Sequence, residues 1–277
     1  YSRSGKILEK VPTALLLPEK AENLYDYLSE KYAVSSLRTY YINFVGAANW
    51  AVKEKLWPVN PYKPHLRELN SLYKPDHGKA YSDSEATAII EAIAKSNHAY
   101  YTGFVKFLFM TGVRPQLAIA LEWEQIIWDE DRPIKIYFDR AHTRGILKPS
   151  KGDRKGKNTP RVFPVNAELA ALIKNLPHYQ TIRREPRISH HFKTVTRPHY
   201  PNLVFPTPVR HWYISIDDFT ERIFRPIVES IVDAGKITEY LPTYHARHTT
   251  QNRWLEAGMS EEAIAALLDT SPEMIRK

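Results

Sequence analysis

The apolar run from Tyr100 to Met110 constrains the fold of this chain more than any other stretch. A helix formed by these residues is apolar almost all round, so it must be surrounded by other elements of the same domain. Gly112 ends this helix, and Pro115 is suited to the first turn of the next. Arg114 therefore lies at a rigid corner between two helices, where a positive charge can be aimed with little reorganisation. The alternative is that Arg114 forms a structural ion pair.

A second arginine lies near the start of a helix predicted within residues 243–258. Pro242 and Thr243 supply a helix start, and Gly258 is the stop expected just past a helix end. Arg247 then lies in the first turns, where free backbone N–H groups and the helix dipole favour an anion. Its guanidinium can hold two phosphate oxygens at once. On this stretch alone, an arginine paired with a nearby carboxylate is the favoured interpretation, because Arg-His pairs near helix starts are common.

Two stretches between these arginines alternate in hydropathy. Residues 133–138 and 161–165 are predicted to form strands of a small antiparallel sheet. The loop between them is strongly basic, and its simplest interpretation is a set of solvated charges that attract phosphate. The basic residues assigned to this loop are Lys148, Lys151, Arg154, Lys155 and Lys157.

The first third of the chain is predicted to be an arm followed by a small helical unit. Residues 1–17 show no clear period and are expected to form the arm. A short helix opens at Pro18, and a longer one, with Arg38 and Lys53 off its apolar stripe, begins at Ser35. The stretch 63–79 is rich in Pro, Lys and Asn and is the predicted interdomain linker. The stripe of the longer helix consists of Leu37, Tyr41, Phe44, Ala48 and Val52.

Net charge indicates the class of partner, and cysteine content limits the kinds of catalytic and metal site. The formal net charge of +8 favours a polyanionic partner, nucleic acid first. The absence of cysteine excludes thiol catalysis and zinc sites built on cysteine. No apolar run approaches the roughly 20 residues of a membrane-spanning helix.

The stretch 178–200 is basic and rich in histidine. His190, His191 and His199 are conceivable zinc ligands, but no second cluster of ligands supports such a site. A solvated or DNA-facing insertion is the preferred interpretation, and no metal is expected.

In combination, these motifs resemble those of the tyrosine recombinase, or phage integrase, family. Residues 111–121 are similar to the family pattern Thr-Gly-Leu-Arg-Pro-Ser-Glu-Ala-Leu-Ala-Leu. Residues 247–249 match the end of His-x-x-Arg-His-Thr, and residues 271–272 match the end of Leu-Gly-His-Ser-Ser-Pro. The sequence departs from the family at three positions, which are Leu117 in place of Glu, Tyr244 in place of His, and Asp269 in place of a second His or Trp.

The resemblance implies a mainly α (α+β) fold. Residues 1–74 would form part of a helical, DNA-clamping core-binding domain, and residues 75–80 a linker. Residues 81–277 would form a mostly helical catalytic domain with a small antiparallel sheet. The nucleophilic Tyr of the family would fall one or two residues beyond Lys277, so residues 1–277 alone are expected to bind DNA without forming a covalent adduct.

The activity that the resemblance implies is site-specific cutting and rejoining of DNA strands through a 3′-phosphotyrosine, without metal or nucleotide. Two arginines would hold the non-bridging oxygens, a lysine would protonate the leaving oxygen, and Tyr244 would supply a hydrogen bond. Asp269 would repel the phosphate unless it is paired or turned away. The implied catalytic residues are Arg114, Lys155, Tyr244, Arg247 and Asp269. Lys155 fits the family spacing of the catalytic lysine best, with Lys157 second and Lys151 third. The implied DNA-binding residues are Arg38, Lys53, Lys148, Lys151, Arg154, Lys157 and Arg161.

The implied partner is double-stranded DNA, bound by a homotetramer on paired sites in the cytoplasm of a prokaryotic or phage-infected cell. Two alternatives stay open, which are a non-catalytic DNA-binding protein derived from a recombinase and an enzyme similar to type IB topoisomerases. Leu117, Tyr244 and Asp269 favour the first alternative. For the recombinase, the guanidinium groups of Arg114 and Arg247 should converge on one pocket, with His248 as buried support.

Overall fold

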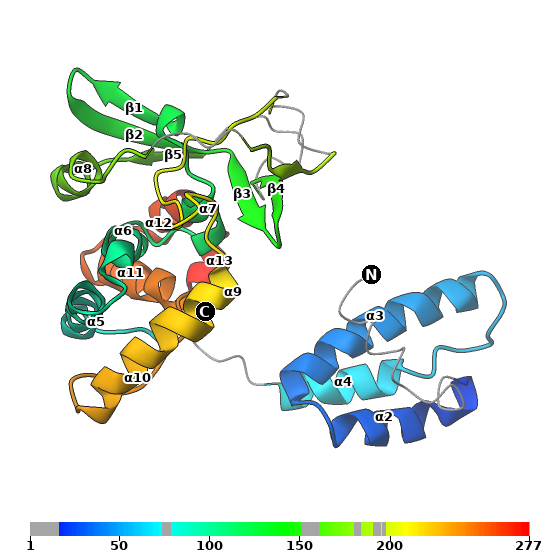
Figure 1. Ribbon diagram of the computed structural model, residues 1–277. Helices are drawn as coiled ribbons and strands as arrows, with labels where there is room; N and C mark the ends of the chain where they lie inside the picture. Colours follow the sequence, from blue (N-terminus) through cyan, green and yellow to red (C-terminus); the bar gives the residue numbers. More distant parts are fainter. Residues whose placement is uncertain are drawn as a thin grey trace. The chain divides into compact units, whose positions relative to one another are not determined.

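The structure is a computed structural model that describes residues 17–73, 79–150, 161–179, 184–190, 195 and 198–276 (Figure 1). Its contacts divide the chain into two compact units, Tyr1–Asp76 and His77–Lys277. None of the helices in these described ranges is both long and apolar enough to cross a membrane.

The N-terminal unit is a small group of helices with its own core (Figure 1). A 3₁₀ turn at Pro18–Lys20 leads into α2 (Ala21–Ser29), which is followed by α3 (Val34–Lys53) and α4 (Lys63–Leu72). Four of the five residues of the predicted apolar stripe of α3 face this core, because residues three and four positions apart lie on one side of a helix. The exception is Val52, which is only half-buried, whereas its neighbour Ala51 is buried. The buried residues of the core are Ala21, Leu24, Leu28, Leu37, Tyr41, Phe44, Ala48, Tyr62 and Leu69.

Helix α4 corrects the prediction that residues 63–79 form a linker. Pro64 is accommodated because a proline in the first helical turn removes no intrahelical hydrogen bond. His65 and Leu69 lie four positions apart and are both buried, and the His65 ring stacks on Tyr25 with centroids 4.7 Å apart. The helix is therefore stabilised by packing of one narrow face, which local composition does not reveal.

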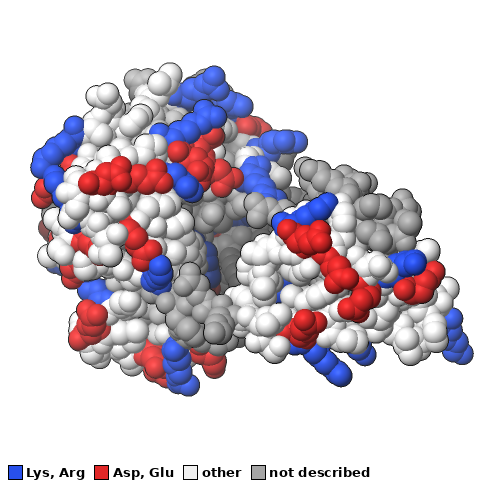
Figure 2. Space-filling view, turned by 90° about the horizontal axis from the view of Figure 1, so that it is seen from below, with Lys and Arg blue, Asp and Glu red and all other residues white. Residues whose placement is uncertain are grey.

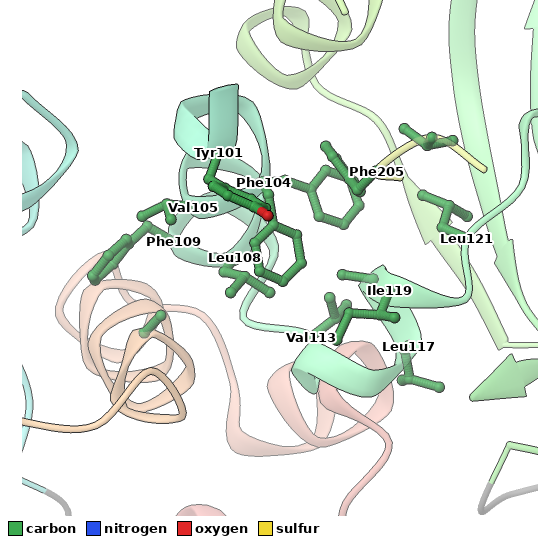
Figure 3. Close-up of a cluster of buried hydrophobic side chains, with 14 of the residues drawn as sticks. Tyr101, Phe104, Val105, Leu108, Phe109, Val113, Leu117, Ile119, Leu121 and Phe205 are labelled. Carbon is green, nitrogen blue, oxygen red and sulfur yellow. The ribbon is translucent and has the colours of Figure 1, made fainter. Parts of the chain in front are cut away.

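The C-terminal unit is mainly helical, as the resemblance implies. Its central helix is α6 (Thr102–Thr111), which follows a 3₁₀ turn at Ala99–Tyr101. Figure 3 shows Phe104 and Leu108 of α6 among apolar side chains that include Phe205. The other helices are α5 (Asp83–Lys95), α7 (Pro115–Ile119), α8 (Ala167–Lys174), α9 (Ile216–Phe219), α10 (Arg225–Asp233), α11 (His245–Glu256), α12 (Glu261–Leu268) and α13 (Pro272–Ile275).

Local sequence signals place several of these helix ends. The sequence Ser82-Asp83-Ser84-Glu85 is typical of a capping box, and Ser82 and Glu85 form one at the start of α5, each bonding the backbone N–H of the other. Gly112 ends α6 with a φ of 57°, and Pro115 opens α7. Gly258, with a φ of 81°, lies just beyond α11. Both glycines adopt the left-handed conformation that other residues rarely tolerate.

The predicted antiparallel sheet is present. It consists of β1 (Ile126–Asp129), β2 (Arg132–Phe138) and β5 (Arg161–Pro164), with β2 in the middle. Ile136 pairs with Phe163 across β2 and β5, and both are buried, because alternate residues of a strand share one face.

A second small sheet occupies part of the stretch that the sequence assigned to a basic loop. It consists of β3 (Arg140–Thr143) and β4 (Ile146–Pro149), which are antiparallel, and β6 (Arg187–Ile188), which is parallel to β4. Lys148 therefore lies in a strand, opposite Ala141, and is half-buried. The assignment of Lys148 to the loop is wrong.

A π-helical turn at Thr220–Phe224 joins α9 to α10 and changes the predicted core face. The sequence pattern predicts one helix with Phe219, Ile223, Ile227 and Ile231 inward. Phe219 and Ile231 are buried as predicted, but between them Phe224 and Val228 are the fully buried residues, and Ile223 and Ile227 are only partly buried. Pro226 has no N–H for the usual hydrogen bond to the carbonyl four residues earlier. The wider turn at this point shifts the buried positions by one residue.

Arg140 lies at the centre of a buried ionic network. Its Nε donates to Asp139 Oδ1 at 2.8 Å, and its Nη1 donates to Glu122 Oε1 at 3.0 Å. His199 Nε2 lies 3.0 Å from the same Glu122 oxygen. The Glu122 side chain is only 6% exposed, so its negative charge depends on these partners.

The interpretation of residues 178–200 as a solvated or DNA-facing insertion is wrong for His199, which contacts the buried Glu122. His178 is exposed, and its ring stacks on Trp123 with centroids 3.7 Å apart. His191 lies outside the described residues. Within the described part of the chain, no group of three or more His, Cys, Asp or Glu residues could hold a metal ion.

Because His142 on β3 is half-buried, the free energy of unfolding is expected to depend on pH. Its ring stacks on Tyr213 with centroids 4.1 Å apart, and burial lowers the pKa of His142 from 6.5 to about 4. Between these values the unfolded chain binds a proton at His142 that the folded chain does not, so the free energy of unfolding should fall as the pH drops from 6.5 towards 4. His142→Phe should flatten this part of the pH dependence. Urea denaturation across the pH range tests this, and parallel pH profiles for wild type and variant would contradict it.

Candidate phosphate-binding site

Arg114 is held at the corner between α6 and α7, as predicted. It is the N-cap residue of α7, with extended backbone (φ −60°, ψ 134°), and Pro115 fixes the first helical position after it. Leu117, where the family usually has Glu, is buried in the main core (Figure 3). Leu117 therefore anchors the corner by apolar packing and contributes no charge to the site.

The Arg114 side chain is paired with Asp269. Nη1 donates to Asp269 Oδ2 at 3.0 Å, and Nη2 donates to the Asp269 backbone carbonyl at 3.0 Å. The side chains are 23% and 27% exposed, respectively, so the pair lies at the edge of the protein interior. A carboxylate at this position is thus neutralised by a cation, which is one of the two arrangements that avoid repulsion of a phosphate.

Asp269 can make both contacts because of its backbone conformation. It ends α12 in the left-handed region (φ 50°, ψ 58°), which Asp tolerates better than most residues. In this conformation, its carbonyl and its carboxylate both face Arg114. The end of α12 is therefore fixed onto the α6–α7 corner.

Arg247 lies in the first turn of α11 and is only 5% exposed. Its Nη1 donates to the Gly112 carbonyl at 3.1 Å, and its Nη2 donates to the Leu268 carbonyl. Burial lowers the pKa of Arg247 to about 10; Tyr244 and Asp269 oppose this decrease, and Arg114 adds to it. Arg247 thus stays a cation at neutral pH, with hydrogen bonds to carbonyl groups instead of a carboxylate.

Close packing of α11 on α6 brings Arg247 to this position. Thr250, one turn further along α11, donates its hydroxyl to the Phe109 carbonyl at 2.8 Å. A Cβ at Gly112 would lie 3.0 Å from Thr250 Cβ and from the Leu268 side chain. Gly112 is therefore required both by its positive φ and by the approach of these two neighbours.

Arg114 and Arg247 converge on the same two chain segments. Arg247 bonds Gly112, two residues before Arg114, and Leu268, the residue before Asp269. Arg114 bonds Asp269 itself. The ends of α6 and α12 and the start of α11 thus meet where both guanidinium groups lie. Each guanidinium uses two of its five N–H donors in these bonds, so donors remain for an anion.

Tyr244 precedes the first residue of α11 and is 43% exposed. It lies close enough to Arg247 to influence the pKa of that residue, and its ring is 5.6 Å from the His248 ring. His248 is expected to be a buried support of the site, but it is only half-buried.

The structure adds Arg161 to this cluster, which the sequence assigns only to general DNA contacts. Arg161 is the first residue of β5, and its guanidinium lies over the rings of Phe138 and Phe163, at 5.4 Å and 5.8 Å from their centroids. Burial lowers the pKa of Arg161 to about 9, with nearby Arg247 and Arg114 adding to the decrease and Asp269 opposing it. The motif that could have indicated this placement is the predicted strand 161–165 itself, whose first residue is Arg161.

Two further residues predicted to contact DNA, Arg38 and Lys53, belong to the N-terminal unit. In the N-terminal unit, Arg38 donates to Asn70 Oδ1 at 2.6 Å and lies over the Tyr73 ring, while Lys53 is exposed at the end of α3. The face of the molecule in Figure 2 carries Lys and Arg interspersed with Asp and Glu. The predicted catalytic Lys155, with Lys151, Arg154 and Lys157, lies outside the described residues.

Comparisons with known proteins identify solved structures that have a similar fold. No protein-family model matches the chain, and neither does any curated protein. Among solved structures, the Tn1549 transposon integrase in complex with transposon right-end DNA is similar, with a TM-score of 0.74, 17% identity, and coverage of 99% of this chain and 85% of that one. The same integrase in complex with circular intermediate DNA gives a TM-score of 0.74 at 16% identity, covering 99% and 85%.

A lambda integrase dimer bound to a COC′ core site is also similar, with a TM-score of 0.61, 12% identity, and coverage of 93% of this chain and 80% of that one. Because the sequence identities are this low, the likeness rests on the arrangement of the backbone alone. The likeness nevertheless extends over both units and agrees with the motifs around Arg114 and Arg247. The chain therefore has the fold of the tyrosine recombinases, the integrase family that its two arginine motifs resemble.

Proposed function

We propose that this chain is the DNA-binding and catalytic region of a site-specific tyrosine recombinase that cuts and rejoins DNA through a 3′-phosphotyrosine. The observation that carries the proposal is the convergence of Arg114 and Arg247 on one corner of the fold. Residues so distant in sequence have no structural need to meet as two like charges, since like charges destabilise each other. A phosphodiester anion between them supplies the reason.

The geometry suits stabilisation of a phosphate transition state. In the attack of a tyrosine oxygen on the phosphate, negative charge grows on the non-bridging oxygens, and fixed N–H donors then lower the barrier. Arg114 is fixed by Pro115 and by Asp269, and Arg247 by two carbonyl groups. Little reorganisation is needed at the moment of reaction, because both guanidinium groups are held by contacts within the protein.

Asp269 balances the charge of Arg114. Its carboxylate occupies Arg114 Nη1, where an incoming phosphate oxygen would otherwise bond. We propose that the phosphate competes with this carboxylate, while the bond from Arg114 Nη2 to the Asp269 carbonyl keeps the side chain in place. Tyr244, exposed beside Arg247, would then donate its hydroxyl hydrogen to the phosphate.

The remaining predicted roles belong to the same proposal. Duplex DNA is the proposed partner, supported by the integrases of the same fold that were solved with DNA. The helical N-terminal unit, with Arg38 and Lys53, would clamp the duplex, and several copies of the protein would assemble on paired sites. Lys155 stays the predicted proton donor to the leaving oxygen.

The test is covalent capture of DNA by the full-length protein that contains this chain. The protein is incubated with sheared genomic DNA from its source, quenched with detergent and recovered with any DNA that stays attached. We expect attached fragments that share a common sequence and are joined through a 3′ phosphate to a tyrosine, because that linkage survives denaturation.

Two results would contradict the proposed site-specific recombinase. Fragments that share a sequence but are released by detergent would indicate a protein that acts by occupancy alone. Covalent fragments without a shared sequence would indicate a relaxing enzyme similar to type IB topoisomerases. The arrangement of Arg114 and Arg247 is compatible with the chemistry of the second alternative, so the shared sequence is the deciding observation.

A further inference from the structure

The guanidinium of Arg161 is buried without a polar partner. Its Nε, Nη1 and Nη2 atoms are all shielded from solvent, and none has a hydrogen-bond partner among the described residues. Arg161 as a whole is half-buried, so its solvent-exposed atoms are not the nitrogens of its guanidinium. A buried cation without a partner is rare, because desolvation of a charge is strongly unfavourable.

The two aromatic rings beside Arg161 do not compensate for this loss. Phe138 and Phe163 lie 5.4 Å and 5.8 Å from the guanidinium carbon, near the outer limit of about 6 Å for a cation–π contact. Such a contact leaves all five N–H donors without acceptors. Packing against the rings fixes where the guanidinium lies, but it does not satisfy its hydrogen-bonding capacity.

The charges around Arg161 favour an anion. Its electrostatic neighbours are Arg247, Arg114 and Asp269. Three guanidinium groups and one carboxylate leave a net charge of two positive at this place. Asp269 is already bonded by Arg114, so it does not serve Arg161 as a hydrogen-bond partner.

From this geometry we infer that Arg161 is a third phosphate-binding guanidinium, which donates to a non-bridging oxygen of the phosphate that Arg114 and Arg247 hold. The inference deepens the proposed function and rests on it. Arg161 is well suited to this role, because β5 pairs with β2 at this end, with Arg161 opposite Phe138. A strand position between two rings holds the side chain in a single orientation.

The experiment compares the full-length wild type with Arg161→Met and Arg161→Lys, on a DNA site recovered by covalent capture. We expect Arg161→Met to slow formation of the covalent adduct about 100-fold, the effect of removing one donor from a transition-state site. Arg161→Lys keeps the charge without the fork of donors and should fall in between. The melting temperature of Arg161→Met should equal or exceed that of the wild type, because no protein hydrogen bond is lost.

Arg225→Met is the matched control. Arg225 also lies over an aromatic ring, that of Tyr240 at 4.8 Å, and its removal changes the net charge equally. It lies on α10, apart from the three arginines of the site, and its variant should form the adduct at the wild-type rate.

A methylphosphonate at the scissile position separates phosphate contact from structural support. This group replaces one charged oxygen with a neutral methyl, so a protein that cuts it no longer needs every positive donor. We expect the difference between wild type and Arg161→Met to shrink towards unity on one of the two methylphosphonate stereoisomers. A difference that is the same on normal and modified DNA would assign Arg161 a structural role and overturn the inference.

The remaining outcomes also decide between the two proposals. If wild type forms no adduct on any DNA, the proposed function fails and the inference with it. If wild type forms the adduct and Arg161→Met forms it equally fast, only the inference fails. If Arg161→Met does not fold, Arg161→Lys is compared in the same way, and wild-type rates for that variant on both DNAs overturn the inference.

Discussion

Arg247→Lys in the full-length protein is expected to slow formation of the covalent DNA adduct about 100- to 1,000-fold. Arg247 bonds the Gly112 and Leu268 carbonyls, and in the proposed function it also binds the phosphate. Lysine offers a single ammonium group on a flexible chain, so it cannot span both carbonyls and a phosphate together. The measurement is the single-turnover rate of adduct formation with protein in excess over DNA.

Arg253→Lys is the matched control on the same helix. Arg253 bonds the Phe109 carbonyl at 3.2 Å and pairs with Asp83, but it does not belong to the phosphate site. Its variant should form the adduct at nearly the wild-type rate. If Arg247→Lys also formed the adduct at that rate, Arg247 would be a support for the ends of α6 and α12 and not a phosphate ligand.

Arg140→Met is expected to lower the free energy of unfolding by about 3–5 kcal/mol, the typical effect of removing one partner from a buried ion pair. Arg140 is only 14% exposed and bonds both Asp139 and Glu122. Its removal leaves the buried Glu122 with His199 as its remaining ionic contact among the described residues. Guanidinium denaturation at neutral pH measures the change as a lower midpoint with an unchanged slope.

The double variant Arg140→Met with Glu122→Leu shows whether the loss arises from the stranded charge. Leucine removes the buried carboxylate that Arg140→Met leaves without its strong partner, so the double variant should regain much of the lost stability. Equal stability of wild type and Arg140→Met would show that water reaches this network. A double variant that is less stable than Arg140→Met would show that packing around Glu122, not charge, holds β3 in place.

The balance of charge at the phosphate site depends on the positions where the chain departs from the family pattern. Asp269 binds Arg114 where the family has a neutral or cationic residue, and Leu117 is buried where the family has an acid. In this chain, the acidic partner of Arg114 therefore comes from the end of α12 and not from α7. Pairing with Arg114 neutralises the Asp269 carboxylate, which is one of the arrangements that avoid repulsion of a phosphate.

The sequence by itself determined the local frame of the site. Gly112 and Pro115 fix the corner that carries Arg114, because each has a backbone conformation that few other residues can replace. The capping box at Ser82 and the alternation in residues 133–138 act in the same way, through hydrogen bonds and side-chain periods within a few residues. These signals are local in the chain, so sequence patterns contain them completely.

The tertiary structure alone decided which charges share a partner. Arg114 meets Asp269 only after α6, α11 and α12 pack together, and Arg161 enters the same cluster only through the pairing of β5 with β2. Helix α4 and the π turn before Arg225 likewise depend on the apolar faces against which they pack. Burial changes the energy of a charge according to all neighbours in space, and a pattern along the chain records only those that are close in sequence.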